Sequence, residues 1–343
     1  MKKLGKFLLS VVMVLLVVGL AIFGLRMFNG QRFSEYEQAE GTPEHYVDVR
    51  NMDVYPTEAE GVSITKVQDG STQGFHMVPD DPQHDGIVIT YGGSEGSPGY
   101  DVALNLAQQG YETLALFFFG QDNQENMLIE VPIDQFEETL SWVESNAENA
   151  DIITLYGASK GAEYAANVAS RFDEVDNVIL MAPASHNYQG LGQTEGSTWT
   201  YEGAELPYLS FRDADPWPYI SETVWPMISY APITYNSTYE PLLNNASNRD
   251  EARIPIEDSA AEVLIFAGGD DQMWPSKQMG ELIVEAKPDA ELHVYEDAGH
   301  LFRGKGVLGA GGMLLNMGGS EEANAEASAL MNEVVLEKLE EWH

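Results

Sequence analysis

The chain has 343 residues, 44% of them hydrophobic, which suits one large globular domain or two small ones with a sizeable core. Its 55 acidic residues outnumber its 17 basic ones. The resulting net charge of -38 repels nucleic acids and anionic membrane surfaces, so no nucleic-acid partner is expected. The sequence contains no cysteine, which excludes disulfides, thiolate metal sites and cysteine nucleophiles.

The N-terminal segment is long and apolar enough to enter a membrane. Lys2, Lys3 and Lys6 precede or border an uncharged run at residues 7–25. At about 1.5 Å per residue, a helix of this run spans roughly the 30 Å core of a bilayer. Residues 1–28 are therefore predicted to form a membrane anchor or a signal segment. An uncleaved anchor fits better, because no small-x-small cleavage site follows the run.

The flanking charges predict how this segment is oriented. The three lysines and the free amine outweigh Arg26 and Arg32 on the other flank, so the N-terminus is expected to be cytoplasmic and the rest extracytoplasmic. Cleavage of the segment would make the chain a secreted protein, and an inverted topology would leave the remainder inside the cell.

Beyond this segment, residues 29–60 are polar and are predicted to be a stalk, and residues 61–343 are predicted to be one folded domain. Helical patterns occur in "YDVALNLAQQG", "IDQFEETLSWVESNA" and "KGAEYAANVASRF". They alternate with apolar runs that are typical of strands covered on both faces: "GVSITKV", "GIVITYGG", "YETLALFFFG", "DIITLYGAS", "NVILMAPAS", "AEVLIFAGGDD" and "ELHVYEDAGH".

This alternation predicts an α/β fold with a doubly wound, mostly parallel sheet, whose functional groups stand at the carboxyl ends of the strands. It is interrupted at about residues 186–253, a segment with eleven aromatic residues. The aromatics argue against disorder, so the segment is predicted to be a cap over the strand ends. The alternative is an extra subdomain with no role in binding.

Within "ITLYGASKGAEYA", Gly157 and Gly161 flank Ser159 as G-x-S-x-G. Between a strand and a helix, this spacing is typical of a nucleophilic serine on a strained turn, because glycine two residues to either side lets the strand and helix approach closely. The alternative is a small residue in an ordinary connection. On the first interpretation the backbone amide of Lys160 points to the same spot as the Ser159 hydroxyl.

A serine nucleophile needs a base and an orienting carboxylate, each just past a later strand. Asp270 and Asp271 follow one predicted strand, and His300 follows the next. Asp271 is the better candidate acid because Trp274 completes a D-x-x-apolar turn, and Asp270 is its competitor. The sequence thus predicts a catalytic triad of Ser159, Asp271 and His300, with solvated loop residues as the alternative.

An oxyanion needs backbone donors from the loop after an early strand. In "VITYGGSEGSPG", Gly92 and Gly93 free the backbone. The amide of Gly93 or of Ser94 is therefore expected to pair with that of Lys160 as the oxyanion hole.

No nucleotide, metal or other cofactor is expected. The glycine-rich stretch matches neither G-x-x-x-x-G-K nor G-x-G-x-x-G with its acidic follower. His45, His76, His84, His186 and His293 show no metal-ligand spacing. His186 lies at the end of a strand near the expected rim of the site, and we interpret it as a hinge residue of the cap.

Several stretches resemble, in order, the C-terminal domain shared by acyl-CoA thioesterases and bile acid-CoA:amino acid N-acyltransferases: "YGGSEG", "GYETLALFFFG", "VPIDQFEETLSWV", "LYGASKGAEYA", "IPIEDSAAEVLIFAGGDDQMWPS", "YEDAGH" and "GGSEEANAEAS". The most specific parts are S-K-G with the following Glu163, and D-D-x-x-W-x-S. The resemblance implies an α/β-hydrolase domain that attacks a thioester carbonyl, with Ser159 as nucleophile, Asp271 as acid and His300 as base. A serine in this place implies transfer to water.

These patterns together predict a serine hydrolase of small-molecule thioesters or carboxylic esters, tied to the membrane by its N-terminal helix. The alternatives are an extracytoplasmic carboxylesterase or peptidase-like hydrolase with no role for CoA, and a non-catalytic surface binding protein that keeps the fold.

Overall fold

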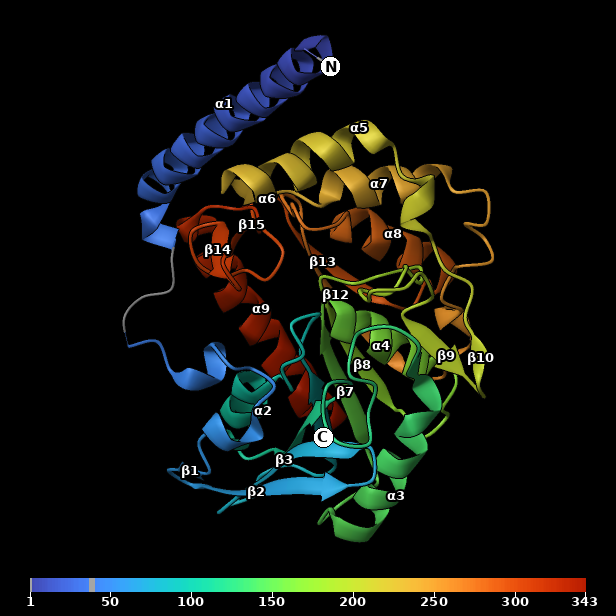
Figure 1. The fold of residues 1–343 in the computed structure, drawn as a ribbon. Helices are drawn as coiled ribbons and strands as arrows, with labels where there is room; N and C mark the ends of the chain where they lie inside the picture. Colours follow the sequence, from blue (N-terminus) through green and yellow to red (C-terminus); the bar gives the residue numbers. More distant parts are fainter. Residues whose placement is uncertain (1, 37–40) are drawn as a thin grey trace.

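The computed structural model describes residues 2–36 and 41–343, and a twisted sheet lies at its centre (Figure 1). Within these residues the sheet has nine strands, which are, in spatial order, β1 (Glu58–Ala59), β2 (Val62–Asp69), β3 (Thr72–Pro79), β5 (Glu112–Phe117), β4 (Ile87–Tyr91), β7 (Ile153–Ala158), β8 (Asn177–Met181), β12 (Glu262–Gly268) and β13 (Glu291–Tyr295).

In spatial order, the strands from β5 to β13 are parallel to one another, whereas β1, β2 and β3 are joined antiparallel at one edge, where β3 also pairs antiparallel with β5. All seven apolar runs of the sequence lie in this sheet, so the predicted α/β fold with a mostly parallel sheet is confirmed. β3 was not among the predicted strands.

Helices cover both faces of the sheet, as a doubly wound fold requires (Figure 1). Two of them share buried clusters on one face, namely α2 (Tyr100–Ala107) and α9 (Glu321–Trp342). Three lie on the other face, namely α3 (Phe136–Asn146), α4 (Lys160–Ala169) and α8 (Ser276–Ala286).

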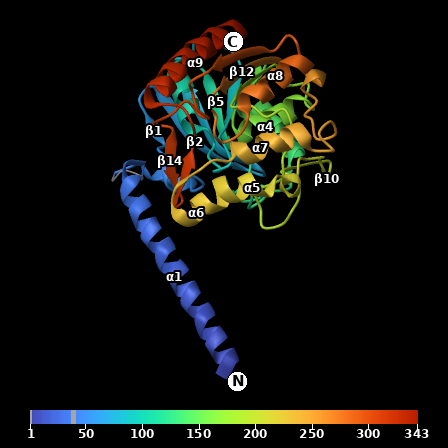
Figure 2. The same cartoon turned by 90° about the horizontal axis from the view of Figure 1, so that it is seen from above.

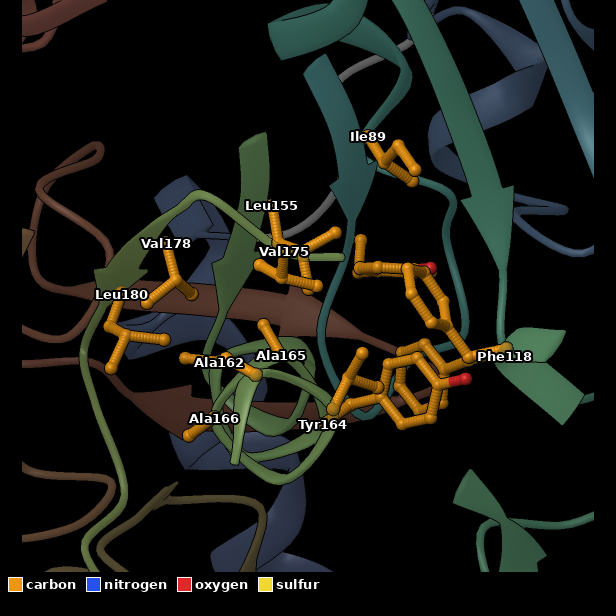
Figure 3. Close-up of a cluster of buried hydrophobic side chains, with 14 of the residues drawn as sticks. Ile89, Phe118, Leu155, Ala162, Tyr164, Ala165, Ala166, Val175, Val178 and Leu180 are labelled. Carbon is orange, nitrogen blue, oxygen red and sulfur yellow. The ribbon is translucent and has the colours of Figure 1, made fainter. Parts of the chain in front are cut away.

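Alternating side chains of each central strand enter the two cores. In β4, Val88 packs in the cluster of α2 and α9, and the next residue, Ile89, packs in the cluster of α4. Figure 3 shows this second cluster, in which the small residues Ala162, Ala165 and Ala166 of α4 pack together with larger side chains such as Leu155 of β7. The small side chains allow α4 to lie close to the sheet directly after the turn at Ser159.

The N-terminal helix α1 (Lys2–Arg32) extends away from the body of the molecule (Figure 2). Within its stretch Lys6–Arg32, an 18-residue window has a mean hydropathy of 3.0, so the helix is long and apolar enough to cross a membrane. Such a helix near the N-terminus is either a membrane span or a signal sequence.

Part of the range predicted as a stalk is folded against the sheet. It contains the short 3-10 helices η1 (Ser34–Tyr36), η2 (Glu44–Tyr46) and η3 (Met52–Val54). Met52 and Tyr55 are buried in the cluster formed by α2, β3 and β5, where the Tyr55 ring lies 5.1 Å from that of Phe75. These residues therefore extend the core beyond the edge strand.

A long excursion connects β8 to β12 above the carboxyl ends of the strands. An antiparallel bridge between His186 and Arg253 joins its two ends. Its elements are β9 (Trp199–Tyr201), β10 (Ala204–Glu205), η5 (Phe211–Asp213), α5 (Pro216–Pro218), the π-helix η6 (Tyr219–Val224), α6 (Trp225–Ser229), β11 (Pro232–Ile233) and α7 (Asn236–Asn245).

Two small sheets attach this excursion to the body. In one, β9 pairs with β6 (Val131–Pro132), which η4 (Ile133–Gln135) follows. In the other, β11 pairs with β15 (Met313–Asn316), the partner of β14 (Val307–Ala310). The helix η7 (Ile256–Asp258) leads back into β12.

Helix α9 offers a matched test of the core beneath the sheet. Leu339 is fully buried there, whereas Leu330 of the same helix is 42% exposed. Leu339→Ala should lower the free energy of unfolding by about 2–5 kcal/mol, because it removes buried methyl groups and leaves a cavity. Leu330→Ala should change it by less than about 1 kcal/mol. Urea unfolding of both variants in mild detergent measures the difference, and equal losses would contradict this packing.

Candidate active site

Ser159 lies on the turn between β7 and α4 with φ 55° and ψ -119°, a conformation that a side-chain-bearing residue rarely adopts. Its amide donates to the carbonyl of Met181 at 2.9 Å. A Cβ on Gly157 would lie 2.2 Å from the carbonyl oxygen of Gly161, and one on Gly161 would lie 2.1 Å from that of Gly92. The strained turn thus depends on glycine at both flanking positions.

The structure brings Ser159, His300 and Asp271 together from the ends of three strands. The Ser159 Oγ lies 2.8 Å from Nε2 of His300, and Nδ1 of the same ring lies 2.8 Å from Oδ2 of Asp271. His300 and Asp271 are each 3% exposed, whereas Ser159 is partly exposed. A hydroxyl, an imidazole and a buried carboxylate thus form one hydrogen-bonded chain.

The contacts of the two neighbouring aspartates differ. Oδ1 of Asp271 accepts the amides of Met273 and Trp274 at 2.8 and 3.2 Å, which leaves Oδ2 for the histidine. Asp270 instead accepts the side chain of Gln272 and the amide of Gly319. Only Asp271 of the two is hydrogen-bonded to the imidazole.

Backbone contacts fix the position of the histidine. The amide of His300 donates to the carbonyl of Met317 at 2.7 Å, and that of Gly299 donates to Oδ1 of Asn324 at 2.8 Å. The Trp274 ring meets the imidazole edge-on, with centroids 5.6 Å apart. The loop after β13 is therefore held by α9 and by the segment next to β15.

The loop after β4 lies beside the serine, where the sequence predicts oxyanion donors. A Cβ built on Gly93 would lie 3.4 Å from Cβ of Ser159. The Gly93 amide is engaged by Oε1 of Glu95 at 3.1 Å, so a carboxylate oxygen occupies this donor. Ser94 follows Gly93 and is exposed, and Lys160 begins α4 directly after the serine.

The side chains of Lys160 and Glu163 form a buried ion pair next to Ser159, a role that the sequence analysis missed. Nζ of Lys160 lies 2.7 Å from Oε2 of Glu163 and donates to Oγ1 of Thr198 at 3.0 Å. The side chains are 2% and 0% exposed. Burial lowers the pKa of Lys160, and the charge of Glu163 opposes this effect. The spacing of Lys160 and Glu163, three residues apart on one predicted helix, was the sequence pattern that could have indicated this ion pair.

The same pair connects α4 to the segment above the strands. Oε1 of Glu163 accepts Nε1 of Trp199 at 2.8 Å and the amide of Tyr188 at 3.1 Å. Oγ1 of Thr198 donates to the carbonyl of Tyr188 at 2.9 Å. One carboxylate therefore binds the lysine next to the serine and two points of the predicted cap.

His186 lies at the base of this segment, where Nδ1 is 2.8 Å from Oγ of Ser185. Burial, and then the charges of Arg249 and Arg253, lower its pKa to about 4. The ring is therefore neutral at physiological pH. Among the residues that the structure describes, no group of three or more His, Asp or Glu side chains is placed to hold a metal ion.

Glu163→Gln tests the buried pair. The substitution keeps the shape of the side chain and leaves the Lys160 charge without its counterion. The free energy of unfolding should therefore fall by about 3–5 kcal/mol. Glu144→Gln, at an exposed position of α3, serves as the control. Urea unfolding measures both, and equal stability of the two variants would contradict a buried charge pair.

This loss should depend on pH. Without the carboxylate the pKa of folded Lys160 falls further, whereas in the unfolded chain it stays near about 10.4. Between these values the unfolded chain binds a proton that the folded variant has lost, so the variant gains stability as pH rises. The difference in free energy of unfolding between the wild type and Glu163→Gln should therefore narrow from about pH 7 to pH 10. A difference that widens over this range would show that the unpaired Lys160 charge is not the cause of the loss.

A family model described as BAAT / Acyl-CoA thioester hydrolase C terminal matches residues 131–304. Acyl-coenzyme A thioesterase 2, mitochondrial, of Mus musculus is 24% identical over 249 residues, which cover 71% of this chain and 50% of that protein. Bile acid-CoA:amino acid N-acyltransferase of the same species is 21% identical over 250 residues, covering 71% of this chain and 55% of that protein. The chain spans about half the length of the curated relatives it matches.

Among solved structures, an esterase of Pyrococcus furiosus aligns with a TM-score of 0.45 and 16% identity, over 70% of this chain and 85% of that chain. The strand order, the helices on both faces and the turn at Ser159 identify the present structure as an α/β hydrolase. The matched range covers half of the sequence and contains Ser159, Asp271 and His300. The chain belongs to the family of acyl-CoA thioester hydrolase and bile acid-CoA:amino acid N-acyltransferase C-terminal domains.

Proposed function

We propose that the protein hydrolyses acyl thioesters or carboxylic esters through an acyl-enzyme on Ser159. The observation that carries the proposal is the hydrogen-bonded chain from Ser159 Oγ through His300 to Asp271. Nucleophilic catalysis requires a base within hydrogen-bond reach of the nucleophile and a carboxylate that orients the base, and this chain supplies both. Family membership supports an acyl group as the part of the substrate that is transferred.

In the first half of the reaction, Nε2 of His300 accepts the Ser159 proton while Oγ attacks the carbonyl carbon. Asp271 stabilises the imidazolium that forms. The same Nε2 then protonates the departing thiol or alcohol, which leaves the acyl group on Oγ. In the second half, Nε2 of His300 takes a proton from water while the water oxygen attacks the acyl carbon. Nε2 then returns this proton to Ser159 Oγ as the bond between Oγ and the acyl carbon breaks, which releases the acid and regenerates the free serine.

The oxyanion donors in this proposal are the amide of Lys160 and that of Gly93 or Ser94. Glu95 now places a carboxylate oxygen on the Gly93 amide, in the way that a substrate oxyanion would. Glu95 is exposed, and its Oε1 also accepts a hydrogen bond from Oγ of Ser97. Substrate binding at the Gly93 amide therefore requires the carboxylate to leave both partners and rotate into solvent. An amide that accommodates the carboxylate oxygen of Glu95 is suited to donate to a substrate oxyanion that takes its place.

We also propose that α1 is a single membrane span, with a cytoplasmic N-terminus and an extracytoplasmic hydrolase domain. The apolar stretch of α1 is long enough to span a bilayer, and in the structure it is not covered by the rest of the chain. This placement favours the alternative function of an extracytoplasmic carboxylesterase with no role for CoA. The net charge of -38 favours the same alternative, because it repels the phosphates of CoA.

Ser159→Ala is the direct test of the nucleophile. It should lower kcat toward p-nitrophenyl esters and acyl thioesters by at least about 10³-fold, because no other group supplies the covalent step. Ser170→Ala, at the other end of α4, is the control and should keep activity. Steady-state assays and circular dichroism on both variants separate chemistry from folding. Unchanged turnover in Ser159→Ala would refute the proposal, whereas absence of turnover in the wild type would favour the non-catalytic binding protein.

A panel of leaving groups on one acyl chain separates the two substrate classes. We expect turnover of the acyl thioesters of both N-acetylcysteamine and CoA. The KM for acyl-CoA should fall as salt rises from about 0.01 to 0.15 M, because salt screens the repulsion between its phosphates and the acidic protein. The KM for the uncharged thioester should not change. Hydrolysis of the p-nitrophenyl ester alone would establish the carboxylesterase alternative.

A further inference from the structure

The helical run α5–η6–α6, residues 216–229, presents large apolar side chains to solvent. We call these side chains the cap ridge. Trp217 is 73% exposed, a high value for a side chain of this size. The other members are exposed by 40–47%. The complete set is Trp217, Tyr219, Ile220, Trp225, Met227 and Ile228.

Helix α6, which carries part of the cap ridge, is hydrogen-bonded through its backbone to the end of the apolar helix α1. Nη1 of Arg26 donates to the last-turn carbonyls of α6, at 3.0 Å to Met227 and 2.9 Å to Ile228. Nδ2 of Asn29, a buried side chain, donates to the carbonyl of Ser229 at 2.9 Å. These bonds satisfy backbone groups that a helix end leaves unpaired, so they hold α6 against α1.

This contact sets the depth of the cap ridge relative to a membrane. Arg26 is the first charged residue after the uncharged run of residues 7–25. A bilayer around that run therefore ends close to Arg26, at the level where α6 is bound. In Figure 2, α5 and α6 lie at the end of the body from which α1 projects, and they run across the direction of α1. The cap ridge thus lies along the expected membrane surface.

The charge of the ridge suits an uncharged lipid surface. Within residues 216–233 the only charged side chain is that of Glu222, although the whole chain carries 55 acidic residues. The acidic body is repelled by anionic lipids, while the ridge offers tryptophan, tyrosine and aliphatic side chains, which favour the interface of a bilayer.

We propose that the cap ridge inserts into the interfacial layer of the same membrane that α1 enters, in contact with zwitterionic lipid. The inference rests on the membrane span that is part of the proposed function. The domain then lies with its cap toward the bilayer, held by α1, by the bonds of Arg26 and Asn29 and by the ridge.

Tryptophan fluorescence of the full chain in phosphatidylcholine nanodiscs tests this insertion. Lipids brominated along the acyl chains quench only tryptophans that reach the bilayer. The wild type should be quenched, and Trp217→Phe/Trp225→Phe should lose most of the quenching, because phenylalanine keeps the ridge apolar and removes its two fluorophores. Trp142→Phe, on α3 at the far end of the body (Figure 1), is the matched control and should be quenched like the wild type.

Co-migration of chain and nanodisc is measured first, and a chain that does not incorporate overturns both the span and the ridge. An incorporated chain whose emission brominated lipid does not quench overturns the ridge alone. If soluble acrylamide also fails to quench Trp217 and Trp225 in that sample, a second copy of the chain covers the ridge instead of lipid. The test does not depend on ester hydrolysis, so it is independent of the outcome for Ser159.

Discussion

The close approach of three backbone segments around Ser159 is the constraint on which the candidate site depends. The end of β7, the first turn of α4 and the loop after β4 approach so closely that neither Gly157 nor Gly161 has room for a Cβ. This approach produces the strained turn that lifts the serine hydroxyl above the sheet. It also brings the loop of Gly93 and the start of α4 to the same point, so the proposed nucleophile and oxyanion donors have one structural origin.

The excursion between β8 and β12 connects that point to the rest of the molecule in two ways. Through the buried pair, Glu163 joins the first turn of α4 to Trp199. Beyond α6, the chain crosses β11 and reaches the loop of the proposed acid, where the amides of Tyr235 and Asn236 donate to the carbonyl of Gln272. The short segment of residues 216–236 therefore carries the cap ridge and contacts both the end of α1 and the acid loop. If the ridge rests in a bilayer, the proposed triad lies close to the membrane surface.

The sequence predicted the fold well because apolar runs without a polar face have few uses other than central strands. It missed β3 because Gln73, Gly74 and His76 interrupt the apolar residues of this strand, so no continuous apolar run marks it. The order of Ser159, Asp271 and His300 was enough to anticipate their meeting, since the ends of parallel strands converge. The local turn at Trp274 was enough to favour Asp271 over Asp270. The bond from Trp199 to Glu163 and the bond from Arg26 to α6, in contrast, depend on tertiary approach between distant segments. No local pattern encodes such contacts.

The central claim is that Ser159 is the residue that becomes acylated. Mass spectrometry of the full chain after reaction with a fluorophosphonate, followed by peptide mapping, measures this directly. The account predicts one adduct per chain on the peptide that contains Ser159, and a strongly reduced rate of labelling when His300 is replaced by alanine, because the serine then lacks its base. An adduct at a different residue, or no adduct on a chain that still hydrolyses esters, would contradict the account.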